Sequence, residues 1–166
     1  IVDEMLAFVL REMTDEQGGF WSALDAESEG EEGKFYRWEK EEVEALLDEE
    51  EFKLFAQVYG LESEPNFENE YYAPQLSKSV SGLVEQVGMS AEKLETKLRP
   101  LRKKLLTARN KRERPLTDTK ILTSWNGLMI RGFADAGRLL ENQRYVDAAS
   151  RAADFVLTEL KTDDDR

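Results

Sequence analysis

Apolar residues recur at spacings of three and four along most of this sequence, and that helical period constrains the fold more than any other feature. The segments that show it are residues 1–13, 39–47, 52–59, 90–110, 125–140 and 144–160. Because this period places apolar side chains on one face of a helix, the sequence predicts a mainly α protein.

The last two segments are expected to form an αα-hairpin, because only a short turn at residues 141–143 separates them. Alanines on the second helix would let the two backbones approach closely. Ser90 and Ser124 are the expected N-caps of the helices that follow them, and Pro100 should interrupt or kink its helix. The residues expected to face one another are Leu128, Met129, Phe133, Ala136 and Leu140 on the first helix and Tyr145, Ala148, Ala149, Ala152, Val156 and Leu160 on the second.

Residues 18–38 break the helical pattern with a segment rich in aromatic side chains. Phe20–Ala23 and Lys34–Trp38 are short and aromatic, which predicts two paired strands forming an inserted aromatic β-hairpin. Between them lie five carboxylates, whose mutual repulsion a ligand, a partner or solvent must offset. These acids are Asp25, Glu27, Glu29, Glu31 and Glu32. Residues 61–79, which hold prolines and asparagines, are expected to form an irregular connection.

The composition limits the chemistry that this chain can perform. Its 166 residues include no cysteine and no histidine, which excludes disulfides, thiolate ligands and the usual general base. Any reaction must use carboxylates, lysine, tyrosine, serine or threonine, and no metal or cofactor is expected. The length suits one domain, and no apolar run approaches the ~18 residues of a membrane span. We expect a soluble, cytoplasmic protein with no membrane partner.

Charge is divided unevenly along the chain. Residues 1–88 carry 23 acidic and 6 basic residues, a net charge of −17, whereas residues 89–166 carry 12 acidic and 17 basic ones, a net charge of +5. The basic cluster of residues 99–114 has two interpretations: a nucleic-acid surface, or a helix that docks on the acidic half. The net charge of −12 would repel phosphate, so no nucleic-acid partner is expected.

The acidic aromatic segment is the first candidate for chemistry. Asp25 and Glu27 lie on the same side of an extended segment and are the predicted catalytic pair, since glycoside hydrolases use two carboxylates for acid–base work. Trp21, Tyr36 and Trp38 could supply flat faces on which a sugar ring stacks, although packing in the hairpin core is the other interpretation. A calcium loop is a further alternative, but its twelfth position, which requires glutamate, is Tyr36.

A second candidate is the polar and aromatic segment from Asp118 to Gly127, where a helix is expected to start. Trp125 and Asn126 favour helix formation poorly, which indicates another demand on these positions, although an N-cap beside a packed tryptophan is the alternative. Trp125 is a further predicted stacking face, and Asp118, Lys120 and Asn126 are predicted to orient hydroxyl groups. We predict that both segments open onto one pocket.

Two segments of this sequence resemble a known family. Residues 18–38, GGFWSALDAESEGEEGKFYRW, and residues 120–130, KILTSWNGLMI, are similar to hallmark segments of the spermatogenesis-associated thioredoxin-like proteins and their bacterial relatives. The resemblance implies an (α/α)6 toroid related to six-hairpin glycosidases and sugar epimerases. Residues 1–166 would be a single partial domain of it, an internal fragment consistent with a first residue Ile1, and a thioredoxin-like domain would lie upstream, outside this chain.

Two functions follow from that resemblance as expectations. In the first, the chain lines part of a pocket for a carbohydrate-like small molecule, and its partners are the remainder of the toroid and the upstream thioredoxin-like domain. In the second, the chain is a non-enzymatic scaffold or interaction module whose acidic loop binds a partner on which the upstream domain acts. The orientation of Asp25 and Glu27 relative to Trp125 and Asn126 would distinguish the two.

Overall fold

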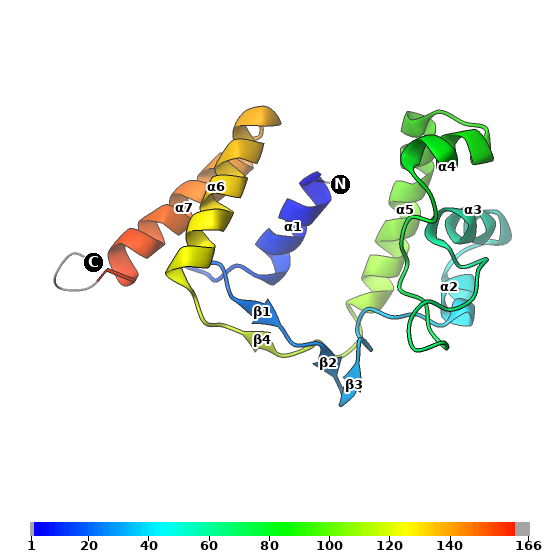
Figure 1. The fold of residues 1–166 in the computed structure, drawn as a ribbon, viewed down its shortest axis with the longest axis horizontal. Helices are drawn as coiled ribbons and strands as arrows, with labels where there is room; N and C mark the ends of the chain where they lie inside the picture. Colours follow the sequence, from blue (N-terminus) through cyan, green and yellow to red (C-terminus); the bar gives the residue numbers. More distant parts are fainter. Residues whose placement is uncertain (1, 162–166) are drawn as a thin grey trace. The chain divides into compact units, whose positions relative to one another are not determined.

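The computed structural model describes residues 2–161, and within that range the chain is mainly helical, as predicted (Figure 1). Its contacts gather in two compact units. Unit 1 comprises the residues up to Asp25 together with those from Leu116 onward, and unit 2 comprises Ala26–Pro115. Each unit has its own hydrophobic core.

The described residues of unit 1 form three helices and one pair of short strands. These are α1 (Val2–Glu12), β1 (Ala23–Leu24), β4 (Thr117–Asp118), α6 (Thr123–Leu139) and α7 (Gln143–Glu159). Phe20, Phe133 and Tyr145 form the centre of its core, and the rings of Phe20 and Phe133 stack with centroids 5.2 Å apart. The Tyr145 hydroxyl donates a hydrogen bond to the Asp3 carboxylate, which ties α7 to α1.

The predicted αα-hairpin is confirmed, since α6 and α7 run side by side (Figure 1). Phe133 and the alanines of α7 lie in the interface. Leu128 and Leu140 do not, and that part of the prediction is wrong: their side chains are 73% and 49% exposed. Leu128 points roughly 140° around the helix from Phe133, because five residues at 100° each separate them, whereas Leu140 lies just after the last helical residue.

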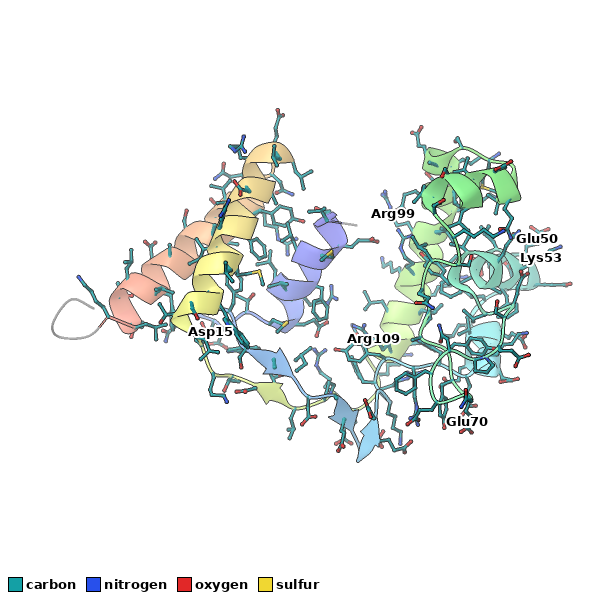
Figure 2. The ribbon with its side chains drawn as sticks, in the orientation of Figure 1. Asp15, Glu50, Lys53, Glu70, Arg99 and Arg109 are labelled. Atoms are coloured by element: carbon teal, nitrogen blue, oxygen red, sulfur yellow. The ribbon has the colours of Figure 1, made fainter. Side chains whose placement is uncertain are left out.

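The predicted cap of α6 is also wrong. The helix begins at Thr123, its N-cap is Leu122, and no side chain caps it. The last turn of α1 is followed by a loop in which the Asp15 carboxylate (Figure 2) accepts hydrogen bonds from the backbone N–H groups of Gln17, Gly18 and Gly19. This Asx-type turn redirects the chain from α1 toward β1.

Unit 2 contains four helices around a leucine-rich core. They are α2 (Lys40–Leu46), α3 (Glu49–Tyr59), α4 (Val80–Val87) and α5 (Ala91–Arg109). Ser90 caps α5 by accepting the N–H of Lys93, as predicted, and Gly60 ends α3 with a φ of 82°. The helix α5 continues through Pro100 without interruption. The apolar period of residues 90–110 is confirmed by four buried leucines, Leu94, Leu98, Leu101 and Leu105.

The irregular connection after Gly60 is confirmed, but the helix that follows it was not predicted. Ser79 caps α4 by accepting the N–H of Gly82. With only eight residues, a glycine inside and three valines, this segment has weak helix propensity of its own. Its Leu83 is 1% exposed, so burial in the core stabilises a helix that its sequence alone does not favour.

The predicted aromatic β-hairpin is wrong in its pairing. Ala23 and Leu24 pair with Asp118 and Thr117 instead, in antiparallel register. A smaller hairpin forms within the acidic tip, where β2 (Glu27–Ser28) pairs with β3 (Glu31–Glu32). Glu29 and Gly30 connect them with φ of 55° and 77°, the left-handed conformation that tight two-residue hairpin turns require.

Candidate functional site

One side chain joins the two segments that carry the family resemblance. Asn126 is 1% exposed, and its Oδ1 accepts the N–H of Phe20 at 2.8 Å. Its Nδ2 donates to the carbonyl of Phe20 at 3.0 Å and to that of Leu122 at 3.1 Å. Because both N–H groups of the carboxamide are engaged, Asn126 positions the backbone beside Trp21 instead of offering these donors to a ligand.

The strand pair β1–β4 extends the same connection. Besides the Ala23–Asp118 register, the backbone N–H of Ser22 donates to the carbonyl of Asp118 at 3.2 Å, and that of Asp25 donates to Leu116 at 2.7 Å. Residues 20–25 and 116–126, about a hundred positions apart, therefore lie side by side within unit 1. The sequence predicted that these segments open onto one pocket; the hydrogen bonds show that the segments are neighbours, and the shared pocket stays a prediction.

Electrostatics around β4 favour an ionised carboxylate. The Asp118 carboxylate lies 3.1 Å from the Lys120 ammonium and accepts the Lys120 backbone N–H at 3.2 Å. The hydrogen bond from the Lys120 side chain is the main reason that the pKa of Asp118 is lowered. Asp118 is therefore ionised near neutral pH and can accept hydrogen bonds, which suits the hydroxyl-orienting role predicted for it.

The three tryptophans differ sharply in exposure. Trp125, in the first turn of α6, is 55% exposed. Trp21 is half-buried. Trp38 is only 5% exposed in the core of unit 2, and the Arg112 guanidinium lies 4.1 Å from its ring centroid. The alternative interpretation of the sequence, that some of these aromatic residues pack in a core, is thus correct for Trp38. Trp125 offers the most accessible indole face of the three.

The remaining predicted residues belong to unit 2. Glu27 is exposed and stands opposite Glu32 in the small hairpin. Tyr36 is half-buried, and burial raises the pKa of its phenol, so the group stays protonated near neutral pH. Nine site residues were predicted, and they fall in both units. Trp21, Asp25, Asp118, Lys120, Trp125 and Asn126 belong to unit 1, whereas Glu27, Tyr36 and Trp38 belong to unit 2.

A network of arginines that the site prediction did not include holds the hairpin region of unit 2. Arg37 is 8% exposed, pairs with the carboxylates of Glu31 and Glu68, and lies 3.8 Å from the ring centroid of Tyr71. Arg112 Nη1 donates to the carbonyls of Lys34, Phe35 and Arg37, and its Nη2 pairs with Glu42 at 3.0 Å. These guanidiniums line a cavity of about 580 Å³.

That cavity is built from ion pairs that the fold itself uses. The pKa of Glu31 is lowered, first by the hydrogen bond from Lys34 and then by that from Arg37. The basic cluster of residues 99–114 accordingly docks on acids of the first half of the chain: besides Arg112 with Glu42, Lys104 pairs with Glu51. This confirms the interpretation of a docked basic helix.

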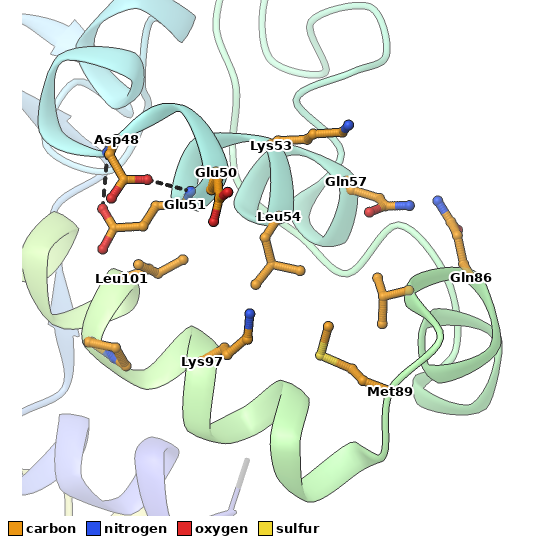
Figure 3. A pocket seen from close by; sticks show the side chains of 12 residues that line it. Asp48, Glu50, Glu51, Lys53, Leu54, Gln57, Gln86, Met89, Lys97 and Leu101 are labelled. Atoms are coloured by element: carbon orange, nitrogen blue, oxygen red, sulfur yellow. Dashed lines mark hydrogen bonds between the residues drawn. The ribbon is translucent and has the colours of Figure 1, made fainter.

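A groove between α3 and α5 is a second concave feature of unit 2 (Figure 3). Its volume is about 530 Å³. Leu54, Met89 and Leu101 line its floor, while the amides of Gln57 and Gln86 point toward one another at one end. No residue of this groove was predicted as functional, because its members are scattered over three helices and form no local motif.

Between residues 2 and 161, no group of three or more Asp or Glu side chains is arranged to hold a metal ion. Over the same range, no helix combines the length and the apolar character that crossing a bilayer requires.

Fold and site together define a class: a helical protein segment in which an αα-hairpin is joined, through Asn126 and a strand pair, to an acidic aromatic loop. No family model matches the sequence. The chain is similar to spermatogenesis-associated protein 20 of Homo sapiens, with 31% identity over 176 aligned residues. It is 32% identical to the protein of that name from Rattus norvegicus and 27% identical to an uncharacterised protein of Caenorhabditis elegans.

The similarity covers nearly all of this chain and a small part of its relatives. The match to the human protein includes 92% of the chain and 22% of that protein, and the match to the nematode protein includes 89% and 23%. The chain thus spans about a fifth of the length of the curated relatives it matches. The resemblance to the spermatogenesis-associated proteins, predicted from two short segments, is confirmed over that stretch.

Proposed function

We propose that this chain forms one wall of a carbohydrate-binding site in a longer helical protein, an (α/α)6 toroid of the six-hairpin glycosidase type. The observation that carries the proposal is the exposed indole of Trp125, whose neighbour Asn126 is hydrogen-bonded to the backbone of Phe20. A large aromatic ring gains most from burial, so an indole left 55% exposed at a helix start favours a ligand that stacks on it.

The chemistry around Trp125 suits a sugar. The apolar face of a sugar ring stacks on an aromatic plane, while its hydroxyls need acceptors and donors at the edge. Asp118 offers an ionised acceptor and Lys120 a cation. Asp25, which belongs to unit 1 like Trp125, is the proposed catalytic carboxylate of this wall, since enzymes that cleave or form a glycosidic bond usually use carboxylates.

The experiment is a titration of monosaccharides and disaccharides into the longer protein, followed by tryptophan fluorescence. We expect a saturable change that Trp125→Ala weakens by about tenfold, in line with the loss of one stacking contact. Leu128→Ala is the matched control, because Leu128 is an exposed apolar residue of the same helix. Absence of any saturable response, or equal affinities for Trp125→Ala and the unaltered protein, would contradict the proposal.

A second candidate function is an interaction module, and a specific observation favours it. Several large apolar residues of unit 1 besides Trp125 are exposed: Leu116, Leu122, Leu128 and Leu139. Extended exposed apolar surface is a mark of protein–protein contacts. In this reading, other helices of the longer protein, or its thioredoxin-like domain, cover α6.

Acrylamide quenching separates the two candidates. If another part of the longer protein covers Trp125, the indole should be protected from acrylamide in that protein without any added sugar. Trp125→Ala should then weaken the packing of that part on α6. If the site binds sugar, quenching should fall only when the sugar is added. A variant of the longer protein in which every tryptophan except Trp125 is replaced by phenylalanine makes the signal specific.

A further inference from the structure

The groove between α2 and α5 in unit 2 has a composition unlike the rest of this acidic chain. It has a volume of about 580 Å³, and Leu46, Pro100 and Ala108 form its apolar part. Thr107 and three lysines, Lys103, Lys104 and Lys111, complete the lining, and no carboxylate belongs to it. The whole sequence carries a net charge of −12, so a groove lined by three lysines and no acid is a local reversal of sign.

Two of these three ammonium groups are not used by the fold. Lys104 pairs with Glu51 at 2.7 Å from one of its oxygens. Lys103 and Lys111 make no ion pair within residues 2–161, and both side chains are exposed. They therefore remain available to an anionic partner that lies along the groove.

The two other hollows of unit 2 described above are not lined by unpaired cations alone. The groove between α3 and α5, on another side of α5, is lined by both signs of charge, with Asp48, Glu50 and Glu51 beside Lys53 and Lys97. In the cavity at the small hairpin, Arg37 and Arg112 are already paired with glutamates. Among the three, the α2–α5 groove is the one whose lining selects an anion.

The groove favours a peptide over other anions. An exposed lysine contributes little to binding a single carboxylate, because water and salt screen the pair, so the ligand must place several charges at once. Nucleic acid would do so, but no aromatic ring lines the groove on which a base could stack. The apolar strip of Leu46, Pro100 and Ala108 instead suits an aliphatic side chain.

We infer that the α2–α5 groove docks a short acidic peptide segment that seats one apolar side chain between Leu46, Pro100 and Ala108 and places its carboxylates on Lys103 and Lys111. This inference goes beyond the proposed carbohydrate site, because it concerns unit 2 and none of the residues of that site. Binding is electrostatic in part, so it weakens as ionic strength rises.

The test uses fluorescence anisotropy with a labelled peptide that alternates leucine and glutamate, titrated with the unaltered chain at low ionic strength. The double variant K103E/K111E should bind about tenfold more weakly or worse, since two attractive pairs become repulsive. The matched control K53E/K97E makes the same change in net charge within the same unit and should stay within about twofold of the unaltered chain. The neutral double variant K103Q/K111Q should fall between them.

Three results would overturn the inference. One is no saturable binding of the acidic peptide. Another is an equal loss in K53E/K97E, which would reduce the effect to overall charge. The third is tighter binding of a single-stranded oligonucleotide that depends on Lys103 and Lys111, which would make this groove a nucleic-acid surface. A peptide with glutamine in place of glutamate should bind at least about tenfold more weakly than the acidic one.

Discussion

At the scale of single residues, two polar side chains connect segments that are distant in sequence. Asn126 satisfies both backbone groups of Phe20, much as a neighbouring strand would. Arg112 brings together three carbonyls of the turn at residues 34–37, the carboxylate of Glu42 and the ring of Trp38. Each is a polar group whose partners are fixed by the tertiary structure and are invisible in the local sequence.

Replacing Asn126 with alanine should lower the free energy of unfolding by about 1–3 kcal/mol, because the buried N–H and carbonyl of Phe20 would lose their partners. Urea denaturation followed by circular dichroism measures this. Ser124→Ala is the control, since Ser124 is exposed in the same turn and caps nothing, and it should change stability by less than about 0.5 kcal/mol. Equal effects of the two substitutions would disprove the role given to Asn126.

Arg112→Lys should destabilise unit 2 although it keeps the charge. Lysine cannot reproduce the planar fork that reaches carbonyls and carboxylate together and stacks on the indole. We expect a loss of about 1–3 kcal/mol in urea unfolding monitored by tryptophan fluorescence. Arg99→Lys, at a side chain 77% exposed, should be nearly neutral. A neutral Arg112→Lys would mean that charge alone matters there.

At the scale of elements, α6 presents two different faces. One packs against α7 so closely that a Cβ at Gly137 would lie 2.7 Å from Val146 Cγ2 and 2.9 Å from its backbone nitrogen. The other face, which includes Gly132, has nothing within 4 Å of such a Cβ. Close packing against α7 therefore requires a glycine at position 137, whereas position 132 has room for a larger side chain.

This contrast gives a prediction with an internal control. Gly137→Ala should destabilise the chain by about 1–3 kcal/mol, because the new methyl group meets backbone that cannot move away. Gly132→Ala should stabilise it by about 0.5–1 kcal/mol, since alanine favours the helix and nothing obstructs it. Thermal unfolding of both variants tests the sign, and a shift in the same direction for both would contradict the packing described.

At the scale of the whole molecule, acidic residues dominate, and basic partners hold several of them ionised. The pKa values of Glu31, Glu51, Glu95 and Asp118 are lowered, chiefly by hydrogen bonds from Lys34, Lys104, Arg102 and Lys120 respectively. In the unfolded chain these carboxyls regain their ordinary pKa values, so at acidic pH the unfolded state binds more protons than the folded one.

The sign of the pH dependence follows from that difference. The stabilisation is fully present above the ordinary carboxyl pKa of about 4–4.5 and is lost as the pH falls through the lowered folded-state values. The free energy of unfolding should therefore decrease from about pH 5 to pH 3, as measured by urea denaturation at a series of pH values. Glu51→Gln should reduce the slope in that range, and a stability that is flat or rises on acidification would refute the assignment.

The sequence by itself determined most of the helices. The period of apolar residues and the caps at Ser90 and Gly60 act within a few residues, so α3, α5 and the αα-hairpin could be predicted from local spacing. The helix α4 was missed because Leu83 is buried by distant parts of unit 2, and that burial outweighs its weak propensity.

The tertiary structure alone decided which strands pair, which aromatics are exposed and what the polar side chains bind. The sequence indicated that residues 18–38 and 120–130 matter, yet the aromatic strands do not pair with each other: Ala23 finds Asp118, and Trp38 is in a core while Trp125 is not. The physical reason is the distance along the sequence between the groups that interact. A helix closes its hydrogen bonds four residues away, whereas a strand, a buried carboxamide or a guanidinium depends on a partner that local sequence does not specify.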